Sequence, residues 1–365
     1  MQNQSSAIIL RWLRLFAESQ FVKIVEETKI STYPNSDTAV VTSITGPDFI
    51  KLQVVQKQTL AGGIHLFELR YPDGSELPAF TAGAHLTVEV PCGVRRNYSL
   101  CSNPADRNFY QIAVKRDAEG RGGSISMVDE VRCNDLLAVS VPRNNFELYP
   151  RATRFLFVAG GIGITPMLSM MRHLKSTGND NFKLIYCTRD AASTAFMDEL
   201  GSPVFAPHVQ LHHDNGDIDQ AFDFWPVFES PTNAHVYCCG PRGLMDAVAD
   251  MSGHWSPSAI HFESFGVDAS IYSANTAFTV RLHKSGEVIA VSAEQSILEA
   301  LRASGHQVTS SCESGTCGSC RTGLLAGEVE HRDMVLGDHE KTSNIMLCVS
   351  RAKSPEPSAE LVLDL

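Results

Sequence analysis

The chain lacks any run of apolar residues long enough to cross a bilayer. A membrane-spanning helix needs about 20 consecutive, mostly apolar residues, and no stretch of the 365-residue sequence approaches that length. The N-terminal stretch MQNQSSAIILRWLRLF also lacks the pattern of a secretory signal, because Arg11 interrupts its apolar run of four residues and no small-residue cleavage site follows. These absences predict a cytoplasmic protein with no membrane partner.

Basic residues are too few for a protein that binds nucleic acid. Lys and Arg number 30 against 41 Asp and Glu, which gives a formal charge of −11, whereas a surface for phosphates needs clustered Lys and Arg. We therefore expect no nucleic-acid partner. The acidic balance leaves two interpretations open, attraction of a basic protein partner or simple solubility.

The chain also has no need of a disulfide framework, although it holds ten cysteines. Such frameworks belong to small secreted domains, and this length suffices for two or three domains of about 150 residues, each with its own core. We expect free or metal-bound thiols. Those predicted to be small buried apolar residues are Cys92, Cys101, Cys133, Cys187 and Cys238.

Four other cysteines have the spacing of an iron–sulfur site. Four residues separate Cys312 from Cys317, two separate Cys317 from Cys320, and 27 lead on to Cys348. This is the plant-type spacing for a [2Fe–2S] cluster, whose irons prefer soft thiolate ligands. A structural zinc site would need two separated ligand pairs, which this spacing does not supply. We predict that all four thiolates bind the cluster.

The residues around these cysteines favour a ferredoxin domain. Gly315 and Gly318 let the loop turn tightly, so that backbone amides can point at the cluster sulfurs. Hydrophobic periodicity predicts a helix and several short strands. The helix is expected at 295–301 and the strands at 277–282, 287–292, 327–330 and 345–348.

A possible flavin site stands in the first half of the chain, in the stretch RNYSL at 96–100. Arg96 could bind a phosphate, Tyr98 could lie against a flat ring and Ser99 could reach the ring's edge. The alternative is an ordinary alternating strand. Strands predicted at 64–70, 85–90 and 109–115 suggest a small antiparallel barrel around it.

The stretch EGRGGSISM at 119–127 follows soon after. Its glycines precede a predicted helix with Ser124 near the cap, and free amides at a helix N-terminus bind phosphate. A plain glycine-rich loop is the alternative.

A buried strand predicted at 154–159 runs into the glycine turn GGIGITPM. With Thr165 as the N-cap and Pro166 at the first helical position, this is a strand–loop–helix phosphate site. Pro166 stands where the usual dinucleotide fingerprint has a third glycine. Further buried strands at 183–187 and 234–239, alternating with helical segments, indicate a parallel α/β nucleotide domain.

The choice of dinucleotide stays open on the residues alone. Arg189 and Asp190 together follow the second strand of that domain. An acidic side chain there suits the ribose hydroxyls of NADH, whereas an arginine accepts the 2′-phosphate of NADPH.

Taken in order, the motifs RNYSL, GRGGS, GGIGITPM, CGP and C-x4-C-x2-C resemble the phthalate dioxygenase reductase and vanillate O-demethylase reductase family over residues 50–365. The resemblance implies an FMN barrel, an NADH domain and a C-terminal [2Fe–2S] ferredoxin of α+β (β-grasp) fold. The domains are then an N-terminal extension at 1–49, the barrel at 50–150, the α/β domain at 151–267, a linker at 268–276 and the ferredoxin at 277–365.

The resemblance also implies roles for single residues. Ser99, Cys239 and Phe265 would stand at the reacting centre, with Phe265 covering the flavin until nicotinamide displaces it. For Phe265 the alternative is a core aromatic at a domain boundary. The residues implied in binding FMN and NADH are Arg96, Tyr98, Ser99, Val114, Lys115, Gly122, Gly123, Ser124, Gly161, Gly163, Thr165, Pro166, Arg189, Asp190, Cys239, Gly240 and Pro241.

By the same resemblance, this is a monomeric enzyme that passes electrons from NADH through FMN and the cluster, one at a time, to a separate Rieske-type oxygenase. That partner would act on an aromatic acid or a small methylated amine, and nothing in this chain selects between them. Two alternatives stay open: a reductase for a cytochrome P450 or another acceptor, and a non-catalytic iron–sulfur redox sensor.

Residues 1–49 fall outside the resemblance. They could be a variable extension or an amphipathic helix that docks on a partner, with turns before the barrel at 34–37 and 45–48. The apolar residues of such a helix would be Ile8, Ile9, Trp12, Leu13, Phe16 and Phe21.

Overall fold

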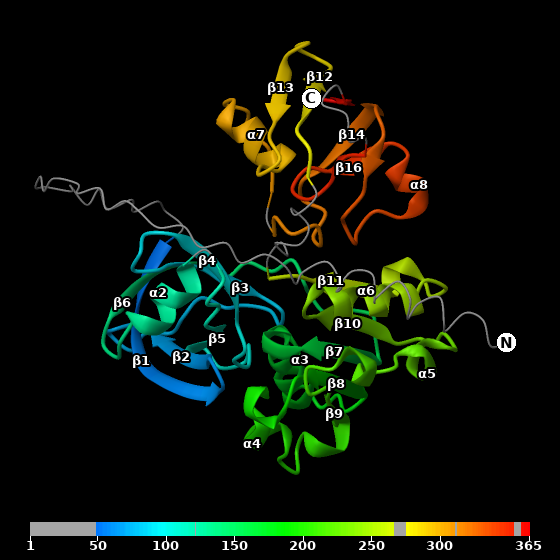
Figure 1. Ribbon diagram of the computed structural model, residues 1–365. Coiled ribbons are helices and arrows are strands. Elements are labelled where there is room, and N and C mark those ends of the chain that lie inside the picture. The colour runs from blue at the N-terminus through cyan, green and yellow to red at the C-terminus, as the bar shows by residue number, and fades with distance from the viewer. Residues whose placement is uncertain (1–48, 121, 266–274, 311, 354–358) are drawn as a thin grey trace, which may run out of the picture. The chain divides into compact units, whose positions relative to one another are not determined.

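The computed structural model describes residues 49–120, 122–265, 275–310, 312–353 and 359–365 (Figure 1). The expectations for residues 1–48, and for the linker up to residue 274, lie outside these ranges. The described chain forms three sheet-based domains, and the three predicted fold classes are confirmed. The predicted domain boundaries stay predictions.

The first domain is a six-stranded antiparallel barrel. Its sheet order is β4-β3-β6-β1-β2-β5, and a bridge between Leu100 and Ile112 joins the two outer strands. Closure of this kind removes unpaired strand edges. The strands are β1 (Phe49–Ala61), β2 (Ile64–Arg70), β3 (His85–Glu89), β4 (Arg95–Ser99), β5 (Tyr110–Lys115) and β6 (Leu136–Ser140), and one helix, α2 (Gly123–Asp129), lies between β5 and β6.

The second domain is a five-stranded parallel sheet of order β11-β10-β7-β8-β9. Every residue of its central strand β7 (Phe155–Gly160) is buried, as expected where helices cover both faces of a parallel sheet. The other strands are β8 (Phe182–Thr188), β9 (Val209–His213), β10 (His235–Cys239) and β11 (Ile260–Glu263).

Two longer helices of this domain, α3 (Ile164–Ser176) and α6 (Arg242–Met251), each begin just after a strand. Shorter helices are α4 (Met197–Leu200) and α5 (Trp225–Phe228). Single 3₁₀ turns stand at Gly161–Gly163, Ala191–Ser193, Ala206–His208, Ile218–Gln220 and Pro257–Ala259.

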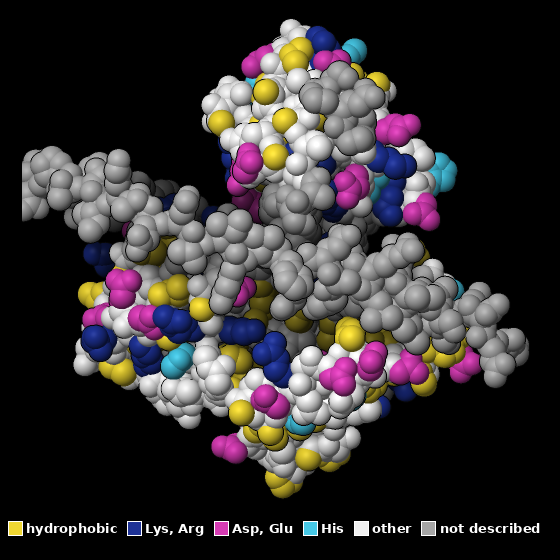
Figure 2. Space-filling view, viewed as in Figure 1, with side chains coloured by type: hydrophobic (Ala, Val, Ile, Leu, Met, Phe, Trp, Pro, Cys, Tyr) yellow, Lys and Arg dark blue, Asp and Glu magenta, His cyan; other side chains and the backbone are white. Residues whose placement is uncertain are grey.

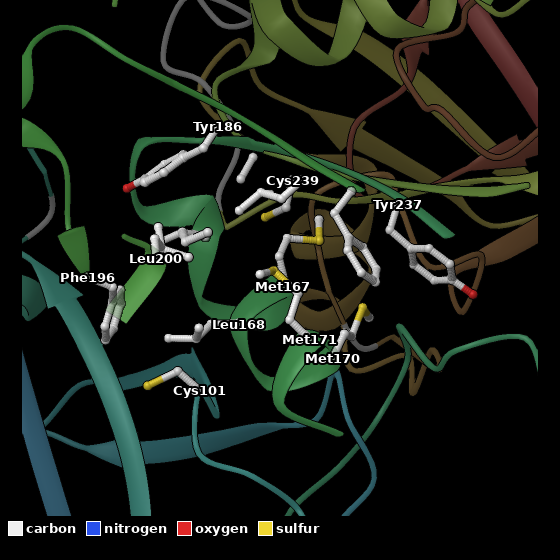
Figure 3. Packing of buried hydrophobic residues seen from close by; sticks show 14 of the residues in the cluster. Cys101, Met167, Leu168, Met170, Met171, Tyr186, Phe196, Leu200, Tyr237 and Cys239 are labelled. Carbon is white, nitrogen blue, oxygen red and sulfur yellow. The ribbon is translucent and has the colours of Figure 1, made fainter. Parts of the chain in front are cut away.

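The barrel and the parallel-sheet domain share one hydrophobic core (Figure 3). Cys101 of the barrel belongs to the same buried cluster as Leu168, Met170 and Met171 of α3, and Figure 3 shows Cys101 facing the side of α3 that carries Leu168. Because this apolar surface is continuous, it holds the two domains together.

The third domain is a mixed sheet of order β13-β12-β18-β14-β16 with its own core. Its helix α7 (Ile297–Ala303) begins two residues later than predicted, because Ser296 caps it in a capping box with Glu299. The strands are β12 (Phe278–Leu282), β13 (Val288–Val291), β14 (Arg321–Ala326), β16 (Asn344–Met346) and β18 (Glu360–Leu363), with a separate pair β15 (Val329–Glu330) and β17 (Arg351–Ala352) and a short helix α8 (Asp338–Lys341).

Acidic and basic side chains are interspersed on the face shown in Figure 2 rather than gathered into one large basic patch. In the part of the chain that the structure describes, no helix is both long enough and apolar enough to cross a membrane.

Candidate functional site

Arg96 lies against the first turn of α2. A Cβ atom on Gly123 would stand 2.7 Å from Nε of Arg96 and 2.9 Å from its Cγ, so a side chain at this position would displace the arginine. The guanidinium group lies beside the amino end of a helix, where the backbone amides carry partial positive charge. This pairing of a cation with free amides suits a phosphate group.

Helix α2 begins at Gly123, two residues earlier than a cap at Ser124 would place it. Gly122 is the N-cap with φ of 82°, in the left-handed region that favours glycine. Ser124 is the second helical residue, and its hydroxyl accepts a hydrogen bond from the backbone amide of Asp117 at 3.1 Å. Glycine offers no side chain to cap the first-turn amides, which are left for a ligand or water.

Tyr98 carries a buried hydroxyl that lacks a hydrogen-bond partner among the described residues. Burial also raises the pKa of this phenol to about 12, so the group is a neutral donor at ordinary pH. An orphaned buried hydroxyl is costly unless something satisfies it. A polar ligand between Tyr98 and the N-terminus of α2 would do so, and a flavin, with a hydroxylated chain ending in phosphate, fits this arrangement.

Ser99, at the end of β4, meets an acidic residue of the parallel-sheet domain. Its hydroxyl donates to Oε2 of Glu263 at 3.4 Å. Glu263 is the last residue of β11, and Cys239 is its register partner on β10. Burial raises the pKa of Glu263 to about 8, with a smaller contribution in the same direction from Cys312, while the hydrogen bond from Ser99 opposes the rise. The site thus holds a carboxyl group that is mostly protonated at neutral pH.

Sequence reasoning missed Glu263. A single acidic residue on a half-buried edge strand gives little signal by itself. The available signal was its position, two residues before Phe265, which the family resemblance implies at the reacting centre. Phe265 is 46% exposed, so it is not a core aromatic. It stands free to lie over a ligand at this end of β11.

The glycine turn after β7 packs directly on the turn after β10. A Cβ on Gly163 would lie 2.1 Å from the carbonyl oxygen of Cys239, and one on Gly160 would lie 2.6 Å from Cδ of Pro241. These contacts leave no space for a side chain. Gly161 has φ of 53° and nothing within 4 Å of its Cβ position. The structure therefore brings the predicted pyrophosphate turn and the Cys239–Gly240–Pro241 turn together.

The predicted cap of α3 is wrong in detail. The helix begins at Ile164, after the 3₁₀ turn Gly161–Gly163, and Gly163 is its N-cap. The hydroxyl of Thr165 instead donates to the carbonyl of Ile162 at 3.1 Å. The 3₁₀ turn continues straight into the helix, so Thr165 and Pro166 fall inside the first turn, where proline is still tolerated.

Asp190 and Arg189 follow β8 as predicted. Asp190 caps the turn Ala191–Ser193, because its Oδ1 accepts from the amide of Ser193 at 2.8 Å. This hydrogen bond also lowers the pKa of Asp190. Arg189 lies along Gly216, with Cδ at 3.6 Å from the Cβ position of that glycine. One carboxylate oxygen and one guanidinium group thus stand at the carboxyl edge of the sheet.

Val114 and Lys115, both predicted to contact a cofactor, differ in how exposed their side chains are. Lys115 ends β5 with its side chain exposed. Val114 points into the barrel core with 1% of its surface exposed. Only the backbone of Val114 can therefore meet a ligand.

The four predicted cluster ligands lie in two pairs. The thiol of Cys317 donates to Cys312 and thereby lowers the pKa of Cys312, and the thiol of Cys348 likewise lowers the pKa of Cys320. Within the described ranges, no three His, Cys, Asp or Glu side chains converge on one metal-ion position. Two irons with two thiolates each fit this arrangement better than a single ion does.

The backbone of the cysteine loop is shaped for such a group. Gly315 has φ of 79°, and its Cβ would stand 2.7 Å from Cγ2 of Val349. The amides of Cys312 and Ser314 each donate to a cysteine sulfur at 3.4 Å. Amide donors of this kind stabilise negative charge on thiolates and on a bound cluster.

Two hydrogen bonds connect the ferredoxin domain to the parallel-sheet domain. The hydroxyl of Ser314 donates to the carbonyl of Ser264 at 3.1 Å, and Nη1 of Arg242 donates to the carbonyl of Arg332 at 2.9 Å. Ser264 lies between Glu263 and Phe265, and Ser314 lies in the cysteine loop.

The remaining cysteines correct one prediction. Cys101 and Cys238 are buried and Cys187 is partly buried, but Cys92 and Cys133 are exposed. Cys92 stands in the turn between β3 and β4, and Cys133 precedes β6, so both belong to loops rather than to the core.

Comparison with known proteins gives the same three parts. The chain matches three family models: an oxidoreductase FAD-binding domain at residues 51–148, an oxidoreductase NAD-binding domain at 157–204 and a 2Fe-2S iron-sulfur cluster binding domain at 280–353. These matches confirm the predicted cofactors as a flavin, NADH and a [2Fe–2S] cluster.

Two curated relatives and one solved structure span nearly the whole described chain. The phthalate 4,5-dioxygenase oxygenase reductase subunit of Pseudomonas putida is 58% identical over 87% of this chain and 97% of its own length. The phthalate dioxygenase reductase of Burkholderia cepacia is 56% identical over 87% and 98%. A solved phthalate dioxygenase reductase, described as a modular structure for electron transfer from pyridine nucleotides to [2Fe-2S], is 56% identical, with a TM-score of 0.67 and coverage of 87% and 98%.

These relatives confirm the predicted family and the predicted class of activity. The chain belongs to the phthalate dioxygenase reductase family, and it is an NADH-dependent flavin and iron–sulfur oxidoreductase that serves as the reductase component of an oxygenase system.

Proposed function

We propose that the chain delivers its electrons, one at a time, to a Rieske-type terminal oxygenase that acts on an aromatic dicarboxylate of the phthalate kind. The observation that carries this proposal is the 58% and 56% identity, over almost the full length of both relatives, to reductases named for phthalate dioxygenases. More distant relatives at 38–39% identity are named for vanillate, tert-butanol and carnitine oxygenation. The two relatives named for phthalate are thus more similar to this chain than these others are.

The flavin in this proposal is FMN. The cation of Arg96 and the free amides after Gly122 would hold a terminal phosphate, and Ser124 would stand beside it. The unpartnered hydroxyl of Tyr98 would bond the polar chain, and Ser99 would lie at the ring edge. A phosphate that ends at α2 suits FMN, because in FAD an adenylate must continue beyond that point.

The dinucleotide would lie along the carboxyl edge of the parallel sheet. Gly161 and Gly163, with the first turn of α3 that contains Thr165 and Pro166, would meet the pyrophosphate. Asp190 would accept from a ribose hydroxyl, with Arg189 beside it. Cys239, Gly240 and Pro241 would border the nicotinamide, which would displace the exposed ring of Phe265.

When bound, the flavin accepts two electrons from NADH as a hydride, and the flavin and the cluster release them singly. The residues of the chain position the cofactors and limit the negative charge beside the flavin. Glu263, protonated near neutral pH, keeps a negative charge away from the flavin edge and accepts the hydrogen bond of Ser99. Cys312 with Cys317, and Cys320 with Cys348, would each hold one iron.

Reconstitution with purified partners tests the proposal. The holo-protein, a phthalate-type Rieske oxygenase, NADH and phthalate should give dihydroxylated product in proportion to NADH consumed. A cytochrome P450 is the competing acceptor, because a solved self-sufficient P450 monooxygenase contains a segment that is similar to this chain. The match is 37% identical and covers 86% of this chain and 41% of that protein. Turnover with the P450 and none with the oxygenase would overturn the proposal.

We further infer a monomer in a reducing cytoplasm, where the thiols outside the cluster site stay free. Sedimentation of the holo-protein at several concentrations checks the first part. A dimer at all of them would contradict it.

A further inference from the structure

We propose that Arg172 is a positioning residue for hydride transfer: it fixes the helix that holds the dinucleotide relative to the strand end that holds the flavin. This inference rests on the proposed sites for both cofactors. Arg172 itself touches neither site. Its hydrogen bonds connect the two protein segments on which those sites are built.

Helix α3, which bears Arg172, begins at the proposed dinucleotide site. Its amino end follows the glycine turn Gly161–Gly163, the proposed pyrophosphate site. Five residues after Ile164, the buried hydroxyl of Ser169 donates to the carbonyl of Ser102 at 2.9 Å. Arg172 lies one turn further along the same face, and its Nη1 donates to the carbonyl of Cys101 at 2.6 Å.

The segment that accepts these hydrogen bonds belongs to the barrel and adjoins the proposed flavin site. Cys101 and Ser102 follow Ser99 by two and three residues, so the carbonyls that α3 binds belong to the same short segment as the proposed ring-edge hydroxyl. That segment is itself held to β5, because the amide of Cys101 donates to the carbonyl of Gln111 at 2.8 Å. A shift of α3 is therefore transmitted to Ser99 through few bonds.

The guanidinium group of Arg172 is held from several directions. Nη1 also donates to Oε1 of Gln111 at 3.1 Å, while Nε and Nη2 bind the two carboxylate oxygens of Glu199 at 2.8 and 2.6 Å. The side chain is only 20% exposed. Such a two-pronged arginine–carboxylate pair is directional, and lysine cannot reproduce it.

Stabilisation of the contact between the barrel and α3 does not by itself explain the hydrogen bonds of Arg172. The barrel and α3 already share a continuous apolar core that includes Cys101 and Leu168, and apolar contact is non-directional, so it joins surfaces without fixing their register. The hydrogen bonds of Ser169 and Arg172 are directional, so they fix the position of α3 relative to the barrel. In this family the register matters, because hydride transfer requires the reacting atoms to be held within a fraction of an ångström.

The test uses the full-length holo-protein with Arg172→Met. Anaerobic stopped-flow reduction by saturating NADH should show flavin reduction slowed about ten- to a hundredfold, since misplacement by about 1 Å costs about 10²-fold. NAD⁺ affinity measured by calorimetry and flavin content should stay within about twofold of wild type, because Arg172 contacts neither proposed site. The long-wavelength charge-transfer absorbance of the NADH complex should weaken.

Arg281→Met is the matched control. Arg281 makes the same two-pronged pair with Glu360, at 3.0 and 2.9 Å, in the ferredoxin domain, and its loss should leave the rate of flavin reduction unchanged. If Arg172→Met does not accumulate as folded holo-protein, Arg172→Lys, which keeps the charge but not the fork, is measured in the same way and should still slow reduction.

An unchanged reduction rate per bound flavin in the Arg172 variants would overturn the positioning role, even if the variants were less stable. Failure of the wild-type protein to be reduced by NADH at all would instead overturn the proposed function. The two failures are therefore distinguishable.

Discussion

The hydroxyl of Ser99 donates to Oε2 of Glu263 at 3.4 Å and thereby joins the end of a barrel strand to the end of a parallel-sheet strand. The two residues are 164 positions apart in the chain. Their meeting point is where a flavin held by the barrel and a nicotinamide held by the sheet would face each other. The raised pKa of Glu263 makes this contact titratable.

Glu263 should give the flavin reduction rate a pH dependence. Because burial raises the pKa of this carboxyl to about 8, it ionises as pH rises through that value, and a carboxylate beside the flavin disfavours the negative charge that arrives with the electrons. We expect the rate to fall across this range in wild type and to stay level in Glu263→Gln. Stopped-flow rates from about pH 6 to 9.5 check this, and the same decline in the variant would exclude Glu263.

The raised pKa of Glu263 also has a consequence for stability. A carboxyl whose pKa is raised on folding stabilises the fold fully below its unfolded pKa, 4.5, and this contribution is lost as pH rises through about 8. Each tenfold difference between the acid dissociation constants of Glu263 in the unfolded and the folded protein contributes at most about 1.4 kcal/mol to the free energy of unfolding. Wild type should therefore lose more thermal stability than Glu263→Gln between about pH 5 and pH 9. Parallel melting curves for the two proteins would contradict a raised pKa at this carboxyl.

Loss of one cluster ligand should separate the two stages of electron transfer. Cys317→Ala removes half of one cysteine pair, so we expect NADH-driven reduction of cytochrome c to fall to background while ferricyanide reduction, which needs only the flavin, persists. Cys133→Ala, at an exposed thiol outside the site, should change neither rate. Loss of both activities in Cys317→Ala would mean that the flavin stage depends on the cluster.

A negative charge at the start of α2 should expel the flavin. Ser124→Asp sets a carboxylate against the proposed phosphate and near Arg96, whereas Ser124→Ala removes only the hydrogen bond from Asp117. We expect bound flavin to fall at least tenfold in the first variant and to stay near wild type in the second. Absorbance after gel filtration measures it, and full retention in Ser124→Asp would move the phosphate elsewhere.

Gly163→Ala should destabilise the nucleotide turn. Its Cβ would meet three backbone atoms, among them the carbonyl oxygen of Cys239 at 2.1 Å, and such overpacking typically costs about 1–3 kcal/mol or more. We expect a lower melting temperature and weaker NAD⁺ binding. Gly62→Ala is the control, since its nearest neighbour would be an oxygen 3.4 Å away. Equal behaviour of the two variants would contradict the close packing of these turns.

Local signals in the sequence were enough to predict the cysteine loop, strand β2 and the strand–glycine turn at β7. Cysteine spacing and buried apolar runs are local properties, so tertiary context does not change their interpretation. Strand β1 went unrecognised because its central residues, KLQVVQKQTL, are mostly polar and its pairing is interrupted by bulges. Its assignment depends on its neighbours β2 and β6.

Sequence reasoning also could not find contacts that exist only between distant segments. Glu263 gains its raised pKa from burial beside Ser99 and Cys239, and Arg172 gains its partners from two domains. Neither residue stands in a motif. The cap of α3 was misplaced for a smaller reason, because a 3₁₀ turn can extend a helix beyond a well-placed threonine.

Electrons pass from NADH through a flavin to a [2Fe–2S] cluster within this one chain. An anaerobic titration of the purified protein with NADH, followed by visible absorbance and by mass identification of the released flavin, is the decisive test of this path. We expect bleaching of both flavin and iron–sulfur bands, uptake of about three electrons per chain and release of FMN. A protein whose bands are absent, or whose spectrum NADH leaves unchanged, would contradict it.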